Sequence, residues 1–375
     1  MGRGRQIVKV LILSCNTGGG HNSAAASIKE CFEGHGYKCD VFNTLDLFSK
    51  GVSKVISRGH VFVYRYLPKL FGAGYRFEEK HGNKILYTAN ASTADELYKY
   101  IKEYKYDAVI AVHVFAELTL TEIRRKYAPD IKMYFVATDY TCSPGVNMGD
   151  MDGYFIPVGL KGEFVRCGVP EERITESGIP VRAVFYNRAD KGEAKRNEGL
   201  SEGGKNILFM SGSMGAGPME EIAELLAEKM PEGVTLTVVC GSNKKLYDEL
   251  LPLAGDSIRI YGFVEHIASL MDASDVMISK PGGLSTTEAL TKHLPLICLN
   301  SVPGCETRNL EFLLKKGYIF HAENVEELVL AAVRLVSDRM WLSEITERLS
   351  GAFNYRAADR IYTRVYEDYE KNVTD

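Results

Sequence analysis

The stretch from 276 to 290 constrains the fold of this chain more than any other. An apolar run at 276–278 leads within a few residues into Gly282 and Gly283, and a helical pattern follows. Such a strand, turn and helix are typical of the parallel sheets of α/β proteins. The first N–H groups of the helix lack backbone partners, so the turn favours an anion. The stretch therefore predicts a phosphate loop, with Glu288 placed to accept hydrogen bonds from a ribose.

A second glycine cluster, residues 18–20, follows the first apolar run and precedes His21. It lacks the Gly-Lys-Ser/Thr of a P-loop and the third glycine of a dinucleotide-binding fingerprint. Asp40 follows at the distance typical of that fingerprint, which leaves an NAD-dependent dehydrogenase as an alternative. A helix N-terminus lowers the basicity of an imidazole, so His21 could act as a general base, although a structural role fits the pattern equally well.

The rest of the chain repeats the same alternation. Its 375 residues favour two α/β domains over one. Strands are expected at 7–14, 38–43, 107–113, 132–138, 153–158 and 174–177, and then at 206–211, 235–240, 258–263, 276–280 and 295–299. We predict an N-terminal domain at 1–180, a C-terminal domain at 181–350, and a terminal helix at 351–375 that can pack back on the first domain. The fold class is α/β with two doubly wound domains.

Hydropathy and cysteine content indicate the cellular compartment of the protein. No apolar run reaches the roughly 18 residues that span a bilayer, and the start of the chain lacks a signal-peptide pattern. The eight cysteines include no C-x-x-C pair, so we expect reduced thiols in a cytoplasmic protein.

One segment is basic, although the whole chain has a net charge of −4. From 47 to 77 the chain has six basic residues, seven aromatic residues and no acidic residue. Such a segment suits an anionic membrane surface on the inner face of the cell membrane, whereas the acidic remainder argues against nucleic acid. A helical hairpin with a solvated basic face is the alternative. The expected membrane contacts are Lys50, Lys54, Arg58, Phe62, Tyr64, Arg65, Tyr66, Lys69 and Phe71.

Polar residues stand at the ends of two predicted strands of the first domain. His113 and Asp139 should lie at the same sheet edge, where either could orient His21 or contact an acceptor. A partly buried histidine and a loop-capping aspartate would look the same. Asp150 and Asp152 form the D-x-D of metal-dependent sugar-nucleotide enzymes, but we expect an ordinary turn there and no metal.

A third glycine-rich loop, residues 211–217, opens the second domain. With the loop at 281–285 it would offer a diphosphate two sets of backbone donors. Arg182, in the joint between the domains, could add a charge-assisted contact. Glu306 and Asn309 stand one turn apart on a predicted helix, where they suit pairs of sugar hydroxyls or are simply solvated.

Together these motifs resemble the monogalactosyldiacylglycerol synthase and processive diacylglycerol glucosyltransferase family, relatives of the transferase that adds N-acetylglucosamine to lipid I. The resemblance is carried, in chain order, by Gly18-Gly19-Gly20-His21, Thr138-Asp139, Gly178-Ile179-Pro180-Val181-Arg182, Gly262-Phe263-Val264, Lys280-Pro281-Gly282-Gly283 with Glu288, and Pro303-Gly304-Cys305-Glu306 with Asn309. It implies a GT-B fold, with two Rossmann-like domains facing across a cleft. The N-terminal domain would bind the membrane and the acceptor, which would enter over the basic segment, and the C-terminal domain would bind the UDP-sugar. It also implies an inverting transfer of a hexose from UDP-glucose or UDP-galactose to the hydroxyl of diacylglycerol, which makes a glycolipid.

The resemblance also implies roles for single residues. His21 would be the general base, with Asp139 as the second catalytic residue. Backbone near Phe263 and Val264 would hold uracil, and Glu288 would hold ribose. The implied donor-binding residues are Gly20, Arg182, Ser213, Met214, Gly215, Phe263, Val264, Pro281, Gly282, Gly283, Leu284, Ser285, Glu288, Glu306 and Asn309. No cofactor is expected, because the UDP-sugar is a substrate and a metal is not required. Cys305 stands where the family usually has Gln, which leaves the donor hexose open.

Two other classes of protein remain open at this stage. A soluble UDP-sugar enzyme of the same fold, such as a 2-epimerase or a transferase with a non-lipid acceptor, would share the donor motifs. A non-catalytic UDP-sugar-binding protein would share them as well.

Overall fold

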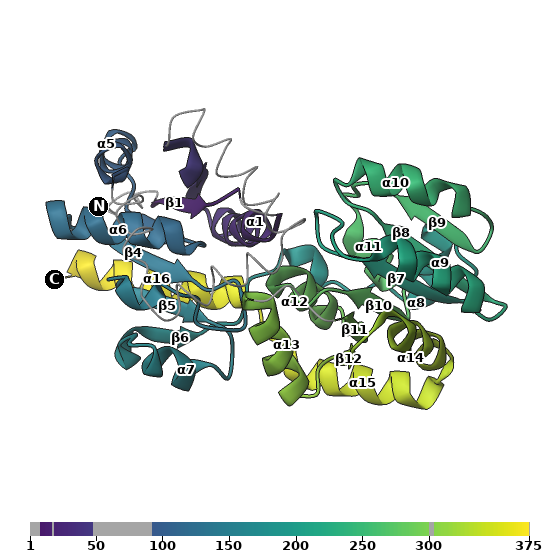
Figure 1. The fold of residues 1–375 in the computed structure, drawn as a ribbon. Helices are drawn as coiled ribbons and strands as arrows, with labels where there is room; N and C mark the ends of the chain where they lie inside the picture. Colours follow the sequence, from purple (N-terminus) through teal and green to yellow (C-terminus); the bar gives the residue numbers. More distant parts are fainter. Residues whose placement is uncertain (1–7, 17–18, 48–91, 300–303, 375) are drawn as a thin grey trace. The chain divides into compact units, whose positions relative to one another are not determined.

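The computed structural model describes residues 8–16, 19–47, 92–299 and 304–374 (Figure 1). These residues form two compact units. Unit 1 comprises Met1–Ala183 together with Arg356–Asp375, and unit 2 comprises Val184–Tyr355. Each unit contains a parallel sheet with flanking helices, which confirms the prediction of two doubly wound α/β domains.

The sheet of unit 1 has the strand order β2-β1-β3-β4-β5-β6 among the described residues. Its strands are β1 (Lys9–Ser14), β2 (Lys38–Asn43), β3 (Ala108–Ala111), β4 (Lys132–Val136), β5 (Gly153–Ile156) and β6 (Ile174–Glu176). Its helices are α1 (Gly19–Gly34), α5 (Ala94–Tyr104), α6 (Val114–Tyr127), α7 (Lys161–Arg166) and α16 (Ala357–Thr374), with short turns η1 (Thr44–Leu47), η2 (Val146–Met148) and η3 (Glu171–Arg173).

Helix α16 belongs to unit 1 although it ends the chain. Ile361 and Val365 of α16 are buried in the same apolar cluster as Phe32 of α1. Tyr362 meets the ring of Phe32 edge-on at 5.4 Å, and Cys31 donates to the carboxylate of Asp359. The apolar face of the terminal helix is therefore covered by α1 and by the sheet of unit 1.

The sheet of unit 2 has the strand order β12-β11-β10-β7-β8-β9. Its strands are β7 (Lys205–Met210), β8 (Val234–Val239), β9 (Ile258–Tyr261), β10 (Val276–Ser279), β11 (Leu296–Leu299) and β12 (Phe320–Ala322). Its helices are α8 (Lys191–Asn197), α9 (Met219–Lys229), α10 (Lys244–Leu250), α11 (Ile267–Asp272), α12 (Gly283–Thr291), α13 (Cys305–Lys315), α14 (Val325–Ser337) and α15 (Arg339–Ala352), with η4 (Ala183–Phe185) at the division of the chain and η5 (Leu251–Leu253) after α10.

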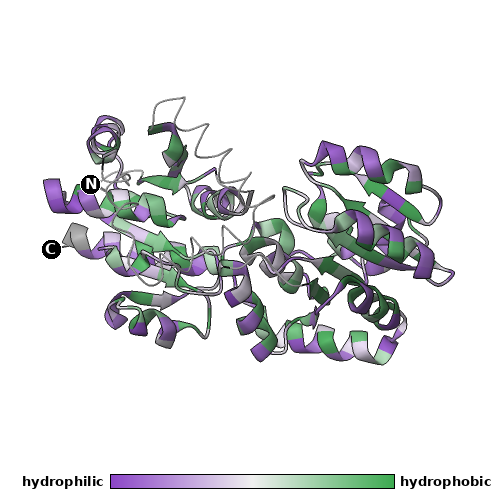
Figure 2. Ribbon diagram, in the orientation of Figure 1, coloured by the Kyte–Doolittle hydropathy of each residue, from purple (hydrophilic) through white to green (hydrophobic). Residues whose placement is uncertain are grey.

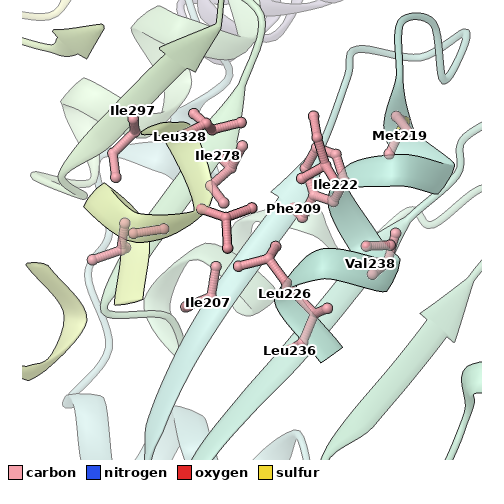
Figure 3. Close-up of a cluster of buried hydrophobic side chains, with 14 of the residues drawn as sticks. Ile207, Phe209, Met219, Ile222, Leu226, Leu236, Val238, Ile278, Ile297 and Leu328 are labelled. Atoms are coloured by element: carbon pink, nitrogen blue, oxygen red, sulfur yellow. The ribbon is translucent and has the colours of Figure 1, made fainter. Parts of the chain in front are cut away.

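The core of unit 2 lies between its sheet and two helices. Figure 3 shows Phe209 of β7, Leu226 of α9 and Leu328 of α14 pointing into one buried cluster. The apolar strands and the polar outer faces of the helices are visible in Figure 2. Burial on both faces explains why the central strands β7 and β10 are mostly apolar.

Candidate functional site

His21 lies in the first turn of α1, directly after β1. The helix begins at Gly19 and ends at Gly34. The structure thus places Gly20 and His21 inside the helix at the carboxyl edge of the sheet.

The tautomer of His21 is set by its neighbours. Its Nδ1 lies 3.0 Å from the carbonyl oxygen of Val112 and 3.1 Å from the hydroxyl oxygen of Thr138. A carbonyl oxygen can only accept a hydrogen bond, so Nδ1 carries the ring proton and Nε2 carries the lone pair. Sequence reasoning named His113 and Asp139 as orienting residues and missed Val112 and the hydroxyl of Thr138.

Electrostatics keep this ring neutral near pH 7. Burial lowers the pKa of His21 below its usual 6.5, while the charge of Asp139 and the hydrogen bond to the Val112 carbonyl act in the opposite direction. The ring of His113 meets His21 edge-on at 4.6 Å. Nδ1 of His113 accepts a hydrogen bond from the N–H of Phe115 and so caps α6. His113 therefore has a structural role as well as a contact with the ring of His21.

The segment after Asp139 is held by a carboxylate from α7. Oε1 of Glu163 accepts hydrogen bonds from the hydroxyl of Thr141 and from the N–H of Cys142, both at 2.8 Å. These bonds anchor the chain within three residues of Asp139. The sequence carried no signal for this role of Glu163.

Other polar residues singled out in unit 1 have partners in the structure. The Nε of Arg182 lies 2.7 Å from Oε1 of Glu30, and its predicted contact with a diphosphate stays a prediction. The D-x-D carboxylates, Asp150 and Asp152, form ion pairs with Arg173 and Arg124. Among the residues that the structure describes, no cluster of three or more His, Cys, Asp or Glu side chains has a metal-binding arrangement.

The loop after β7 in unit 2 is shaped by glycines. Gly212, Gly215 and Gly217 have φ of 63°, 54° and 93°, a region that strongly favours glycine. A Cβ on Gly215 would lie 2.2 Å from the carbonyl oxygen of Cys240, so no side chain fits between this loop and the one after β8. In this loop Ser213 is exposed and Met214 is half-buried.

The loop after β10 leads directly into α12. Gly282 is the N-cap, so the backbone N–H groups of the first helical turn begin at Gly283 and continue through Leu284 and Ser285. This turn has the predicted anion-binding geometry. Glu288, further along the same helix, is 8% exposed.

Buried hydroxyls lie beside this loop. The hydroxyl oxygens of Ser279, at the end of β10, and Thr286, in α12, are buried and have no hydrogen-bond partner among the described residues. Unsatisfied buried polar atoms are costly unless a ligand or water satisfies them, so their presence here supports a polar ligand site.

Helix α13 contacts the same loop through two residues. The amide of the fully buried Asn309 donates to the carbonyl oxygen of Pro281 at 3.0 Å. The carboxylate of Glu306 lies 2.7 Å from the ammonium of Lys280. Asn309 therefore holds the loop in place, a role that the sequence did not indicate, while its contact with sugar hydroxyls stays a prediction. Lys280 was named in the family motif but not as a binding residue.

A cavity of about 370 Å³ lies beside the loops that follow β8 and β9. It includes Phe263, whose side chain is 69% exposed, whereas Val264 does not line it. Tyr247 and Tyr261 supply further aromatic surface, which suits a planar base. The complete lining is Gly241, Ser242, Lys244, Tyr247, Ile260, Tyr261, Gly262 and Phe263.

The predicted membrane- and acceptor-contacting residues, from Lys50 to Phe71, lie outside the described residues. Within the described part of the chain, no helix has the length and apolar character needed to cross a membrane.

Two Rossmann-like units, one with a histidine at its sheet edge and one with glycine loops and a base-sized cavity, define a glycosyltransferase of the GT-B fold. Solved structures with this fold include MurG of Acinetobacter baumannii, with a TM-score of 0.63 and 15% identity over 96% of this chain and 99% of that one. Anabaena Alr3699/HepE in complex with UDP-glucose aligns with a TM-score of 0.60 and 15% identity over 97% and 99%.

Family models identify the two halves separately. Residues 21–181 match the monogalactosyldiacylglycerol (MGDG) synthase model, and residues 206–303 match the glycosyltransferase family 28 C-terminal domain. A processive diacylglycerol beta-glucosyltransferase of Bacillus cereus (strain AH187) is 28% identical over 94% of this chain and 92% of its own length. The corresponding enzyme of Bacillus thuringiensis (strain Al Hakam) is 27% identical over 96% and 94%. These matches confirm the resemblance to the monogalactosyldiacylglycerol synthase and processive diacylglycerol glucosyltransferase family that the motifs predicted.

Proposed function

We propose that this glycosyltransferase moves a hexose from UDP-glucose or UDP-galactose to the hydroxyl of diacylglycerol, with inversion at the anomeric carbon. The relatives named for diacylglycerol support the acceptor. The observation that carries the chemistry is the neutral His21, whose Nε2 lone pair is available as a base.

In the proposed reaction, Nε2 of His21 takes the proton of the acceptor hydroxyl. The oxygen forms a bond to the anomeric carbon as the bond from that carbon to the β-phosphate oxygen breaks, and UDP leaves with the electron pair. Asp139 stabilises the imidazolium that results, because its charge favours the protonated ring.

The loops of unit 2 hold the donor in this proposal. Backbone N–H groups of the loops at 211–217 and 281–285 stabilise the charge that develops on the departing diphosphate, without a metal. Glu288 binds the ribose hydroxyls, and the cavity at Phe263 takes the uracil. The basic segment would bring the protein to the inner face of the membrane as a peripheral protein.

The test uses radiolabelled UDP-glucose and UDP-galactose with vesicles that contain diacylglycerol, followed by chromatography of the lipids. Label should move into a lipid with at least one of the two donors. A wild-type protein that moves no label into lipid would contradict the lipid acceptor and favour a soluble acceptor or a non-catalytic role.

A histidine variant tests the base. His21→Ala should lower turnover by roughly 10²-fold or more and leave UDP affinity nearly intact. His35→Ala is the matched control, because His35 lies at the other end of α1, where it stacks on Tyr362 at 3.8 Å. Near-normal turnover by the His21 variant would show that another group accepts the proton.

A further inference from the structure

Lys280 forms an ion pair at the point where three parts of unit 2 meet. Its ammonium lies 2.7 Å from Oε1 of Glu306, and the two side chains are only 20% and 12% exposed. Removing two charges from water is costly, and attraction within the pair often does no more than offset that cost. A shielded ion pair of this kind is therefore weak evidence that it stabilises the fold. Its position between the loops points to a role in ligand binding instead.

Gly212 makes room for the lysine, and Gly282 lies close to it. A Cβ on Gly212 would lie 2.9 Å from Cε of Lys280, so the aliphatic chain of the lysine runs against the loop after β7. A Cβ on Gly282 would lie 3.7 Å from the same Cε and 4.0 Å from Oε1 of Glu306. Lys280 thus lies between the two predicted phosphate loops, and its charge points to the first turn of α13.

Helix α13 is connected to the loop after β10 twice, and the two connections differ in chemistry. The amide of Asn309 donates to the carbonyl oxygen of Pro281, which fixes backbone to helix. The pair of Lys280 and Glu306 instead fixes a carboxylate at the mouth of the loop. Of these two connections, only the Lys280–Glu306 pair sets the orientation of a partly exposed carboxylate, that of Glu306.

Unit 2 contains a second buried lysine–carboxylate pair, and its surroundings differ from those of Lys280 and Glu306. Lys195 and Asp275, each 4% exposed, pair at 2.9 Å at the amino edge of the sheet, away from the glycine loops. The oxygen of Asp275 that binds Lys195 also accepts a backbone N–H from Asn206, and Lys195 donates to the carbonyl oxygen of Gly204. The pair of Lys195 and Asp275 therefore satisfies backbone N–H and carbonyl groups, which is a structural role. Lys280 instead lies between the two predicted phosphate loops.

We propose that Lys280 is a specificity-determining positioning residue that holds the Glu306 carboxylate in one orientation for the hydroxyls of the donor hexose. The inference rests on the proposed function, since it assumes a nucleoside diphosphate hexose as the ligand. It makes Lys280 a residue that distinguishes UDP-hexose from UDP, because only the former presents hydroxyls to Glu306.

The test compares the affinities of UDP and UDP-glucose by isothermal titration calorimetry. Lys280→Met should lower the ratio of UDP-glucose affinity to UDP affinity by about tenfold, the usual effect of a lost charged hydrogen bond. Lys280→Arg, which keeps the charge, should restore most of the ratio. Lys245→Met is the matched control, because it removes an exposed lysine–glutamate pair on α10 and should leave the ratio unchanged.

A double variant shows whether Lys280 acts through Glu306. Glu306→Gln should lower the ratio by itself, and Lys280→Met added to it should change the ratio no further. Independent, additive effects would overturn the inference, as would equal losses of UDP and UDP-glucose affinity in Lys280→Met. Thermal unfolding of each variant shows whether it is folded.

Failure of the proposed function would look different. A wild-type protein that binds UDP-glucose more tightly than UDP, with the ratio dependent on Lys280, and yet transfers no hexose to diacylglycerol would refute the proposed reaction and support the inference. A wild-type protein that binds neither nucleotide would overturn both.

Discussion

The pH dependence of stability should change when Glu117 is replaced by glutamine. Glu117 of α6 is fully buried, and neither carboxylate oxygen has a hydrogen-bond partner among the described residues. Burial raises the pKa of Glu117 well above its ordinary value of about 4.5. The residue lies under Gly149, where a Cβ would stand 2.0 Å from Oε1, in the segment that follows Asp139.

The sign of the effect follows from the protons bound in each state. Above pH 4.5 the unfolded chain loses the proton of Glu117, while the folded protein keeps it up to the raised pKa. The free energy of unfolding therefore falls by about 1.4 kcal/mol for each pH unit in that window. Glu117→Gln removes this contribution. The buried amide adds a cost of about 1–3 kcal/mol, but that cost does not depend on pH.

Urea titrations at several pH values between 5 and 7, followed by circular dichroism, measure the difference. The stability of Glu117→Gln relative to wild type should rise with pH by about 1.4 kcal/mol per unit. Glu96→Gln, on the exposed surface of α5, should show no such trend. A constant difference between Glu117→Gln and wild type would mean that Glu117 is ionised in the folded protein, and the reasoning from burial would be wrong.

Three further predictions concern the site. Asp139→Asn removes a charge that raises the pKa of His21, so the acid limb of the pH profile of kcat/KM should move to lower pH; an unchanged limb would exclude this coupling. Glu288→Ala should weaken UDP binding about tenfold by calorimetry, and unchanged affinity would remove its ribose assignment. Gly215→Ala places a Cβ 2.2 Å from a backbone oxygen and should lower both Tm and UDP affinity. Gly217→Ala meets no atom within 4 Å and should cost less; equal losses would show that φ alone is responsible.

The fold could be predicted largely because strands of a parallel sheet are buried on both faces. The runs that became β1 and β10 have apolar centres, at 10–13 and 276–278, and glycines mark the turns that follow them. Strand β12 (Phe320–Ala322) was not predicted, since three residues at a sheet edge carry no periodic pattern.

The candidate site could be predicted only where backbone geometry demands a residue type. The glycines of the loop at 211–217 were found because positive φ and close backbone approach leave few alternatives there. Lys280 was not identified as a binding residue, because its partner, Glu306, lies in a different element, α13. Likewise, nothing local to Asn309 indicates that its amide binds the carbonyl of Pro281. Contacts between elements decide such roles, and a pattern along one element does not contain them.

The return of α16 to unit 1 has a consequence for synthesis on the ribosome. Unit 2, Val184–Tyr355, is in effect an insertion into unit 1, because Arg356–Asp375 completes the first unit. Its 172 residues take roughly 9 to 34 s to translate at 5–20 residues per second. During that interval the face of α1 that α16 later covers, including Phe32, is open to solvent. The nascent first unit therefore presents an apolar surface that a chaperone can bind. Helix α16 can dock on this surface only after the second unit has been translated.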